Sequence, residues 1–115
     1  MTLYRDRETQ YVENCAGGEG AMIRGCCLPD DMLGGKLTYA AHNTLEPHST
    51  LGVHPHIGEN ETYLITSGSG MYHDNDEYYA VKTGDVLYCG DGDSHSLENP
   101  NDEPLTFFAF IQANN

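Results

Sequence analysis

The sequence predicts an all-β fold, a sandwich or barrel built from short strands. Segments rich in β-forming residues recur about every 8–12 residues with turn residues between them, which is typical of such folds. Thirteen glycines, five prolines and eight tyrosines, with no tryptophan, favour strands and turns over helices. No apolar pattern of helical period runs beyond a few turns. At 115 residues the chain is expected to form a single domain.

Residues 1–20 are expected to form an N-terminal arm, and residues 21–115 the domain. The arm is polar and ends in Gly17-Gly18-Glu19-Gly20, a stretch that favours flexibility. In the domain, each expected strand is a β-rich segment, and these strands are 22–27, 36–43, 49–56, 61–66, 71–73, 77–82, 86–89, 95–99 and 105–112. Segments rich in Gly, Pro, Asn and Asp separate them, at 29–31, 34–35, 46–48, 58–60, 68–70, 74–76, 83–85, 90–93 and 100–104. The break at 74–76 is expected to be a hairpin turn.

The charge of the chain excludes several classes of partner. Five Lys and Arg against 18 Asp and Glu give a formal charge of −13 at pH 7. Nucleic acids and anionic membrane surfaces are bound mainly through Lys and Arg, so neither is expected as a partner. No segment approaches the ~20 apolar residues that span a bilayer, and the first residues lack the apolar stretch of a secretory signal. A cytoplasmic location is expected, in which the cysteines are small buried thiols: Cys15, Cys26, Cys27 and Cys89.

Four residues have the types and spacing of a metal site. His54 and His56 are two positions apart on an expected strand, so their side chains point to the same face. Glu61 can add a carboxylate from the next strand, and His95 a third imidazole from a later one. This ligand set suits Mn, Fe, Ni, Co or Zn, and an octahedral ion would keep two positions open for water or substrate. The other histidines are interpreted as surface or hydrogen-bonded residues: His42, His48 and His73.

Two stretches around these residues resemble the motifs of the cupin superfamily. The first places His54, His56, Glu61 and Gly68 on the spacing of the first cupin motif, and the second does so for the second motif with Gly84, Gly92, His95 and Asn99. His48 replaces the usual opening glycine and is expected to alter only a turn. Gly90 replaces the usual proline and is expected to loosen the loop before His95.

The resemblance is strongest for residues 48–99. Among cupins, the sequence is most similar to small single-domain proteins of the oxalate-decarboxylase-like type. The resemblance implies a double-stranded β-helix, that is, a jelly-roll barrel, with one divalent transition metal per chain held inside by His54, His56, Glu61 and His95. Manganese is expected first, with Fe, Ni, Co or Zn as alternatives. The resemblance also implies a homodimer, and the apolar run 107–111 is expected to close the barrel or a dimer seam.

Strand alternation predicts which neighbours face the metal. Tyr63 and Ile65 are expected on the face of Glu61, and Thr50 and Gly52 on the face of His54. On the strand 86–89, either Val86 and Tyr88 or Leu87 and Cys89 face inward, and the sequence leaves this open.

Three residues are candidates for catalysis. Arg24, on an expected strand, can pair with a substrate carboxylate. Glu59, in the break at 58–60, can act as a proton donor on a mobile lid, and Tyr63 (or His73) as an acid or base.

Three hypotheses about function follow from this site. The first is a metalloenzyme that acts on a small oxygen-rich carboxylate such as oxalate, with the metal as Lewis acid or redox centre. The second is a metal-dependent isomerase or lyase that acts on a sugar-derived substrate. The third is a non-catalytic module that binds a small ligand in the barrel.

Overall fold

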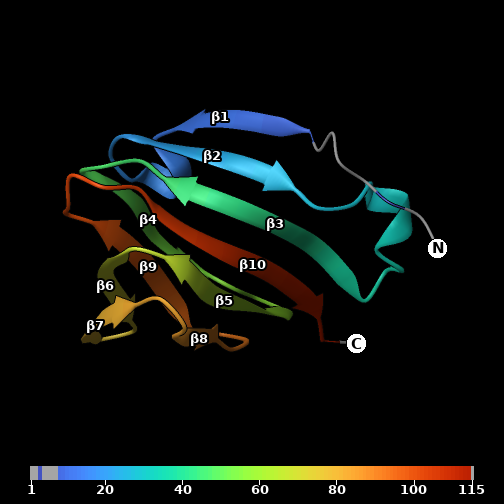
Figure 1. Ribbon diagram of the computed structural model, residues 1–115. Coiled ribbons are helices and arrows are strands. Elements are labelled where there is room, and N and C mark those ends of the chain that lie inside the picture. The colour runs from blue at the N-terminus through green and yellow to red at the C-terminus, as the bar shows by residue number, and fades with distance from the viewer. Residues whose placement is uncertain (1–2, 4–7, 115) are drawn as a thin grey trace.

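The computed structural model describes residue 3 and residues 8–114, and the described chain folds into two facing antiparallel sheets (Figure 1). The larger sheet has six strands in the order β1-β2-β3-β10-β5-β8, and the smaller has four in the order β4-β9-β6-β7. The strands are β1 (Thr9–Glu13), β2 (Ala21–Cys26), β3 (Leu37–Leu45), β4 (Ser49–Pro55), β5 (Glu59–Ser67), β6 (Ser69–Asp74), β7 (Glu77–Lys82), β8 (Val86–Cys89), β9 (Ser94–Asn99) and β10 (Leu105–Ala113). Two short 3-10 turns, η1 (Cys15–Gly17) and η2 (Asp30–Met32), complete the described elements. Within this part of the chain, no helix is both long and apolar enough to cross a membrane.

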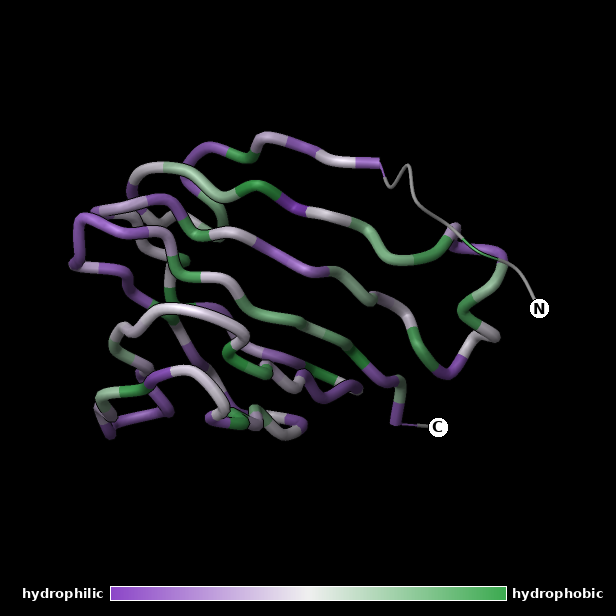
Figure 2. The backbone as a smooth tube through the Cα atoms, in the orientation of Figure 1, coloured by the Kyte–Doolittle hydropathy of each residue, from purple (hydrophilic) through white to green (hydrophobic). Residues whose placement is uncertain are grey.

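The core lies between the two sheets, where alternate residues of each strand point inward. Green hydrophobic segments alternate with purple hydrophilic ones along the strands (Figure 2). On β10, Phe107 and Ala109 are buried, and the strand lies between β3 and β5 in the larger sheet. The expected apolar run therefore closes the middle of that sheet.

Alternation also settles the two faces of β5 and β8. Glu61, Tyr63 and Ile65 are all buried, at 5%, 3% and 1% exposure, as expected for one inward face. On β8 the inward residues are Leu87 and Cys89. Burial raises the pKa of the Cys89 thiol to about 12, so this cysteine is a neutral core group.

β4 contradicts the expectation that Thr50 and Gly52 share the face of His54. Leu51 pairs with Leu97 and His54 pairs with His95, so β4 has one more residue than β9 between these two pairs. Such a β-bulge interrupts the alternation of side chains. Leu51 is therefore buried on the same side as His54, in place of the two residues expected there.

The described part of the expected arm contains a strand that the sequence did not predict. Residues 9–13 form β1, which pairs with β2 along its whole length. Four of these five residues are exposed, so β1 carries no alternating apolar pattern by which the sequence could reveal a strand. Gly18 packs so closely on β4 that a Cβ atom there would lie 2.1 Å from the carbonyl oxygen of Thr50. Residues 1–2 and 4–7 of the arm lie outside the described residues.

The expected break at 58–60 is also shorter in the structure. Glu59 and Asn60 already belong to β5, because this strand pairs with β10 as far as Glu59 opposite Ala113.

His48 lies in the turn between β3 and β4 with a φ of 57°, a left-handed conformation that favours glycine. The departure from the usual glycine is thus confined to a turn.

Candidate metal centre

Four side chains from three strands converge at one point between the sheets. His54 comes from β4, His56 follows the end of that strand, Glu61 comes from β5 and His95 from β9. One ligand atom from each lies within 4.8 Å of all the others. His56, Glu61 and His95 are buried, and His54 is partly buried.

The outer nitrogen of each imidazole is held by a neighbouring group. His54 Nδ1 lies 2.7 Å from the carbonyl oxygen of Gly52, and His56 Nδ1 lies 2.9 Å from Glu59 Oε1. Because a carbonyl and a carboxylate only accept, each Nδ1 donates, and the neutral ring then presents a bare lone pair at Nε2. The Tyr72 hydroxyl lies 3.0 Å from His95 Nδ1 and orients the third ring.

The spacing of the inner atoms fits one transition-metal ion. His95 Nε2 lies 2.9 Å from His54 Nε2, 3.1 Å from His56 Nε2 and 3.0 Å from Glu61 Oε1. Two donors bound at about 2.1 Å to one ion and at right angles to each other lie about 3.0 Å apart. The residues present therefore fit a divalent ion in both donor type and spacing.

The electrostatics of the cluster also favour a cation. Burial acts to raise the pKa of Glu61, but the imidazoles of His54, His95 and His56 around the carboxylate favour its charged form and outweigh burial, and the pKa is lowered to about 2. Burial lowers the pKa of His95. Glu61 therefore stays ionised and His95 stays neutral. These are the charge states in which a carboxylate and an imidazole bind a metal ion.

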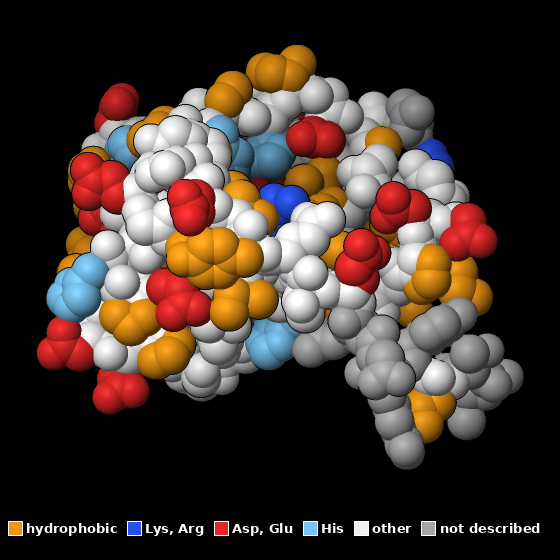
Figure 3. Space-filling model, turned by 90° about the horizontal axis from the view of Figure 1, so that it is seen from above, with side chains coloured by type: hydrophobic (Ala, Val, Ile, Leu, Met, Phe, Trp, Pro, Cys, Tyr) orange, Lys and Arg blue, Asp and Glu red, His pale blue; other side chains and the backbone are white. Residues whose placement is uncertain are grey.

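A cavity of about 380 Å³ opens onto this cluster. Figure 3 shows histidine side chains gathered beside a basic side chain on a hollowed face of the molecule. The apolar part of the cavity wall comes from both sheets and includes Met22, Leu51, Phe107 and Ile111. The polar part includes Arg24, Tyr39 and Asn43 in addition to His54, His56 and Glu61.

The comparison with known families agrees with this geometry. The model of the cupin domain matches residues 41–111, which is more than half of the chain. The chain belongs to the cupin family. The predicted jelly-roll barrel is thereby confirmed.

Two relatives of this cupin have similar sequences. The oxalate-binding protein of Thermotoga maritima is 37% identical over 102 residues, which cover 89% of this chain and 84% of that protein. An uncharacterized protein of Methanocaldococcus jannaschii is 31% identical over 87 residues, which cover 76% of this chain and 69% of that protein.

Solved structures extend the similarity. A predicted oxalate decarboxylase from Thermotoga maritima has a TM-score of 0.93 and 33% identity, and the match covers 97% of this chain and 99% of that chain. A cupin 2 conserved barrel domain protein from Salinispora arenicola has a TM-score of 0.72 at 18% identity, with 97% and 88% covered, and shows the shared fold alone.

Two of the three candidate catalytic residues line the cavity of this cupin, and the third does not. Arg24 and Tyr63 line the cavity. The Tyr63 hydroxyl lies 3.5 Å from His95 Nε2, and burial, with the charge of Glu61, raises the pKa of Tyr63 well above its usual value. Glu59 contacts the outer nitrogen of His56 and is not among the lining residues. Its role as a proton donor stays a prediction. In the structure, Glu59 instead orients the ring of His56, one of the four metal-site residues.

Four further residues around the site were not predicted: Tyr39, Asn43, Leu51 and Tyr72. Leu51 faces inward because of the bulge, which the sequence does not signal. Asn43 lies opposite Arg24 because β3 pairs with β2, Tyr39 lies opposite Ile111 because β3 pairs with β10, and Tyr72 reaches His95 because β6 pairs with β9. Strand pairing within each sheet determines all three positions, and the sequence spacing alone does not reveal which strands pair.

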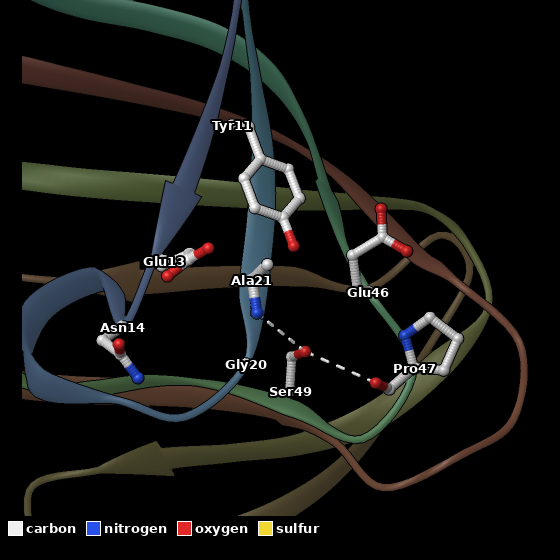
Figure 4. A pocket seen from close by; sticks show the side chains of 8 residues that line it. All are labelled: Tyr11, Glu13, Asn14, Gly20, Ala21, Glu46, Pro47 and Ser49. Carbon is white, nitrogen blue, oxygen red and sulfur yellow. Dashed lines mark hydrogen bonds between the residues drawn. The ribbon is translucent and has the colours of Figure 1, made fainter.

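A second hollow lies away from the metal cluster, between β1, β2 and the turn after β3 (Figure 4). It is an open groove of about 600 Å³ whose walls include Tyr11, Glu13 and Glu46. Its buried polar side chain, Ser49, is already paired: Oγ accepts from the Ala21 amide at 3.0 Å and donates to the Pro47 carbonyl at 3.4 Å. Among the described residues that line this groove, no buried polar side-chain atom is left without a hydrogen-bond partner.

Proposed function

We propose that this cupin binds one divalent transition-metal ion through His54, His56, Glu61 and His95 and takes a small, oxalate-like carboxylate as substrate. The observation that carries the proposal is the position of Arg24 in the wall of the cavity that opens onto the metal cluster. A metal ion and a guanidinium at one cavity are the two cationic groups that an organic dianion requires. The name of the oxalate-binding relative supports the same ligand class.

The residues of the chain have separate roles in this proposal. A bound divalent ion supplies a Lewis acid that polarises a carboxylate oxygen. Arg24 compensates negative charge on the ligand, and the apolar wall residues exclude water around it. Tyr63 keeps its proton at neutral pH and can donate it in a hydrogen bond near the metal cluster. Manganese is the ion we propose, and a homodimer is the assembly.

One observation favours a non-catalytic binding function as the second candidate. Among the described residues that line the cavity, Glu61 is the one carboxylate, and it belongs to the metal cluster. Decarboxylation needs a separate proton donor, and a tyrosine with a raised pKa is a weak acid for this step. Ligand binding without turnover would fit such a cavity.

The proposal is tested first by elemental analysis of protein purified without chelators. We expect about one Mn, Fe, Co, Ni or Zn per chain, and loss of this metal in His56→Ala. His42→Ala is the matched control, because His42 contacts Thr66 outside the cluster, and it should keep the metal. Full metal occupancy in His56→Ala would contradict the ligand assignment.

Calorimetric titration with oxalate then tests the ligand. Metal-loaded protein should bind oxalate, whereas metal-free protein and Arg24→Gln should bind it at least tenfold more weakly, as expected for loss of a charged hydrogen bond. Release of CO₂ separates the enzyme from the binding module. Equal affinity with and without metal would refute a metal-dependent site.

A further inference from the structure

One residue in the wall of the cavity carries a polar atom that has no hydrogen-bond partner within the described part of the chain. Asn43 is 2% exposed and lines the cavity from β3. Its Nδ2 donates to the Tyr39 hydroxyl oxygen at 3.1 Å, whereas its Oδ1 is buried and unpaired among the described residues. A buried acceptor without a partner costs about 1–3 kcal/mol, so such atoms in a binding cavity call for a donor from the ligand.

Two neighbours of Asn43 complete a small recognition set. Arg24 is the cross-strand partner of Asn43 on β2, and Tyr39 is four residues before it on the same face of β3. The Tyr39 hydroxyl oxygen accepts from Arg24 Nε at 3.0 Å and from Asn43, so its own proton remains available to donate. Arg24 Nη1 donates to Gln10 at 3.2 Å, which fixes the guanidinium from outside the cavity.

This set differs from what a bare dianion requires. Arg24 and Tyr39 offer donors, which suit a carboxylate, but Asn43 Oδ1 offers an acceptor. Oxalate at neutral pH has acceptor atoms only, so it would leave Asn43 Oδ1 unpaired. The cavity is also larger than oxalate needs, because about 380 Å³ corresponds to roughly a dozen waters at about 30 Å³ each.

We infer that the preferred ligand is a small organic acid that chelates the metal at one end and carries a hydroxyl or amide donor for Asn43 Oδ1 at the other. The inference rests on the proposed metal-dependent carboxylate site and adds the distal group of the ligand. Arg24 and Tyr39 then bind an oxygen of the same distal end. Asn43 becomes the residue that sets specificity.

The test compares acids that differ by one hydroxyl group. Pyruvate and 3-hydroxypyruvate share charge and chelating end, and 2-oxobutyrate and 4-hydroxy-2-oxobutyrate repeat the comparison with a longer chain. Calorimetric titration of the metal-loaded protein should show about tenfold tighter binding of the hydroxylated member in at least one pair. This comparison needs no variant.

Variants then assign the preference to Asn43. In Asn43→Leu, a substitution of similar size, the ratio of the two affinities should fall to about one. Asn43→Asp keeps an acceptor oxygen and should keep the ratio even if both acids bind more weakly; it serves where Asn43→Leu does not fold. Asn60→Leu is the matched control, because Asn60 also has a buried unpaired Oδ1 but does not line the cavity. It should retain the tenfold ratio, with metal content checked by elemental analysis.

The outcomes separate the two proposals. Binding of all four acids without a preference for the hydroxylated members, or tighter binding of the parent acids, would overturn the inference and leave the carboxylate site standing. A preference that persists in Asn43→Leu would also overturn it. No binding of any acid, oxalate included, would overturn the proposed function and the inference together.

Discussion

At the scale of single residues, the hydrogen-bond partners of the histidine ligands determine the metal affinity of the cluster. Glu59 accepts from His56 Nδ1 at 2.9 Å and so fixes the ring with its Nε2 toward the centre. We expect Glu59→Ala to weaken metal affinity by about 10–100-fold, the usual effect of removing such a partner. Competition with a chelator of known affinity measures this. Glu77→Ala, an exposed carboxylate on β7, is the control, and unchanged affinity in Glu59→Ala would favour the lid interpretation instead.

Glu61 makes the stability of the metal-free protein depend on pH. Its pKa is about 2 in the folded chain against a usual 4.5, so its contribution is fully present above pH 4.5 and is lost as the pH falls toward 2. The raised pKa of His54 acts in a separate window, above pH 6.5. We expect wild-type protein in chelator to lose on the order of 3 kcal/mol more than Glu61→Gln between pH 5 and pH 2. Urea unfolding across this range measures the difference, and parallel curves would contradict it.

At the scale of elements, the turn η1 packs closely against Gly52 of β4. A Cβ on Gly52 of β4 would lie 2.0 Å from the carbonyl oxygen of Ala16, and Ala16 and Cys15 form part of the cavity wall. Gly52→Ala should therefore destabilise the protein by about 1–3 kcal/mol and speed hydrogen exchange in residues 14–20. Gly90→Ala is the control, because its nearest neighbour is a side-chain oxygen at 3.2 Å. Wild-type exchange in Gly52→Ala would show that η1 is held by other contacts.

The elements also show what the sequence can predict. All nine predicted strands occur, with ends shifted by at most two residues, because turn residues bound each of them. Tyr63 could be oriented from Glu61 because β5 alternates regularly. Leu51 could not be oriented from His54, because the bulge depends on pairing with β9. The cluster of ligands follows from spacing, whereas Asn43 and Tyr39 depend on which strands become neighbours.

At the scale of the whole molecule, the metal cluster joins the two sheets. Glu61 belongs to the larger sheet, and His54 and His95 belong to the smaller one. An ion bound to the folded chain at about 100 times its Kd adds about 2.7 kcal/mol, which corresponds to a rise in Tm of roughly 10 °C at this size. Chelator should remove this rise in wild type and in His42→Ala, whereas Glu61→Gln should lack it from the start. Scanning calorimetry measures it, and an unchanged Tm on chelation would argue against a link between the sheets.

The position of β10 also sets an order of events in time. This strand, which follows every other described strand, lies between β3 and β5 and pairs with both. Until it is synthesised, the two halves of the larger sheet have no common neighbour, and β5, which carries Glu61, pairs with β8 but is not joined to β1, β2 and β3. Contacts between such distant segments form late. We therefore expect the ligand cluster to assemble after Leu105–Ala113 leave the ribosome, so that the nascent chain acquires its ion after synthesis of this strand and not during it.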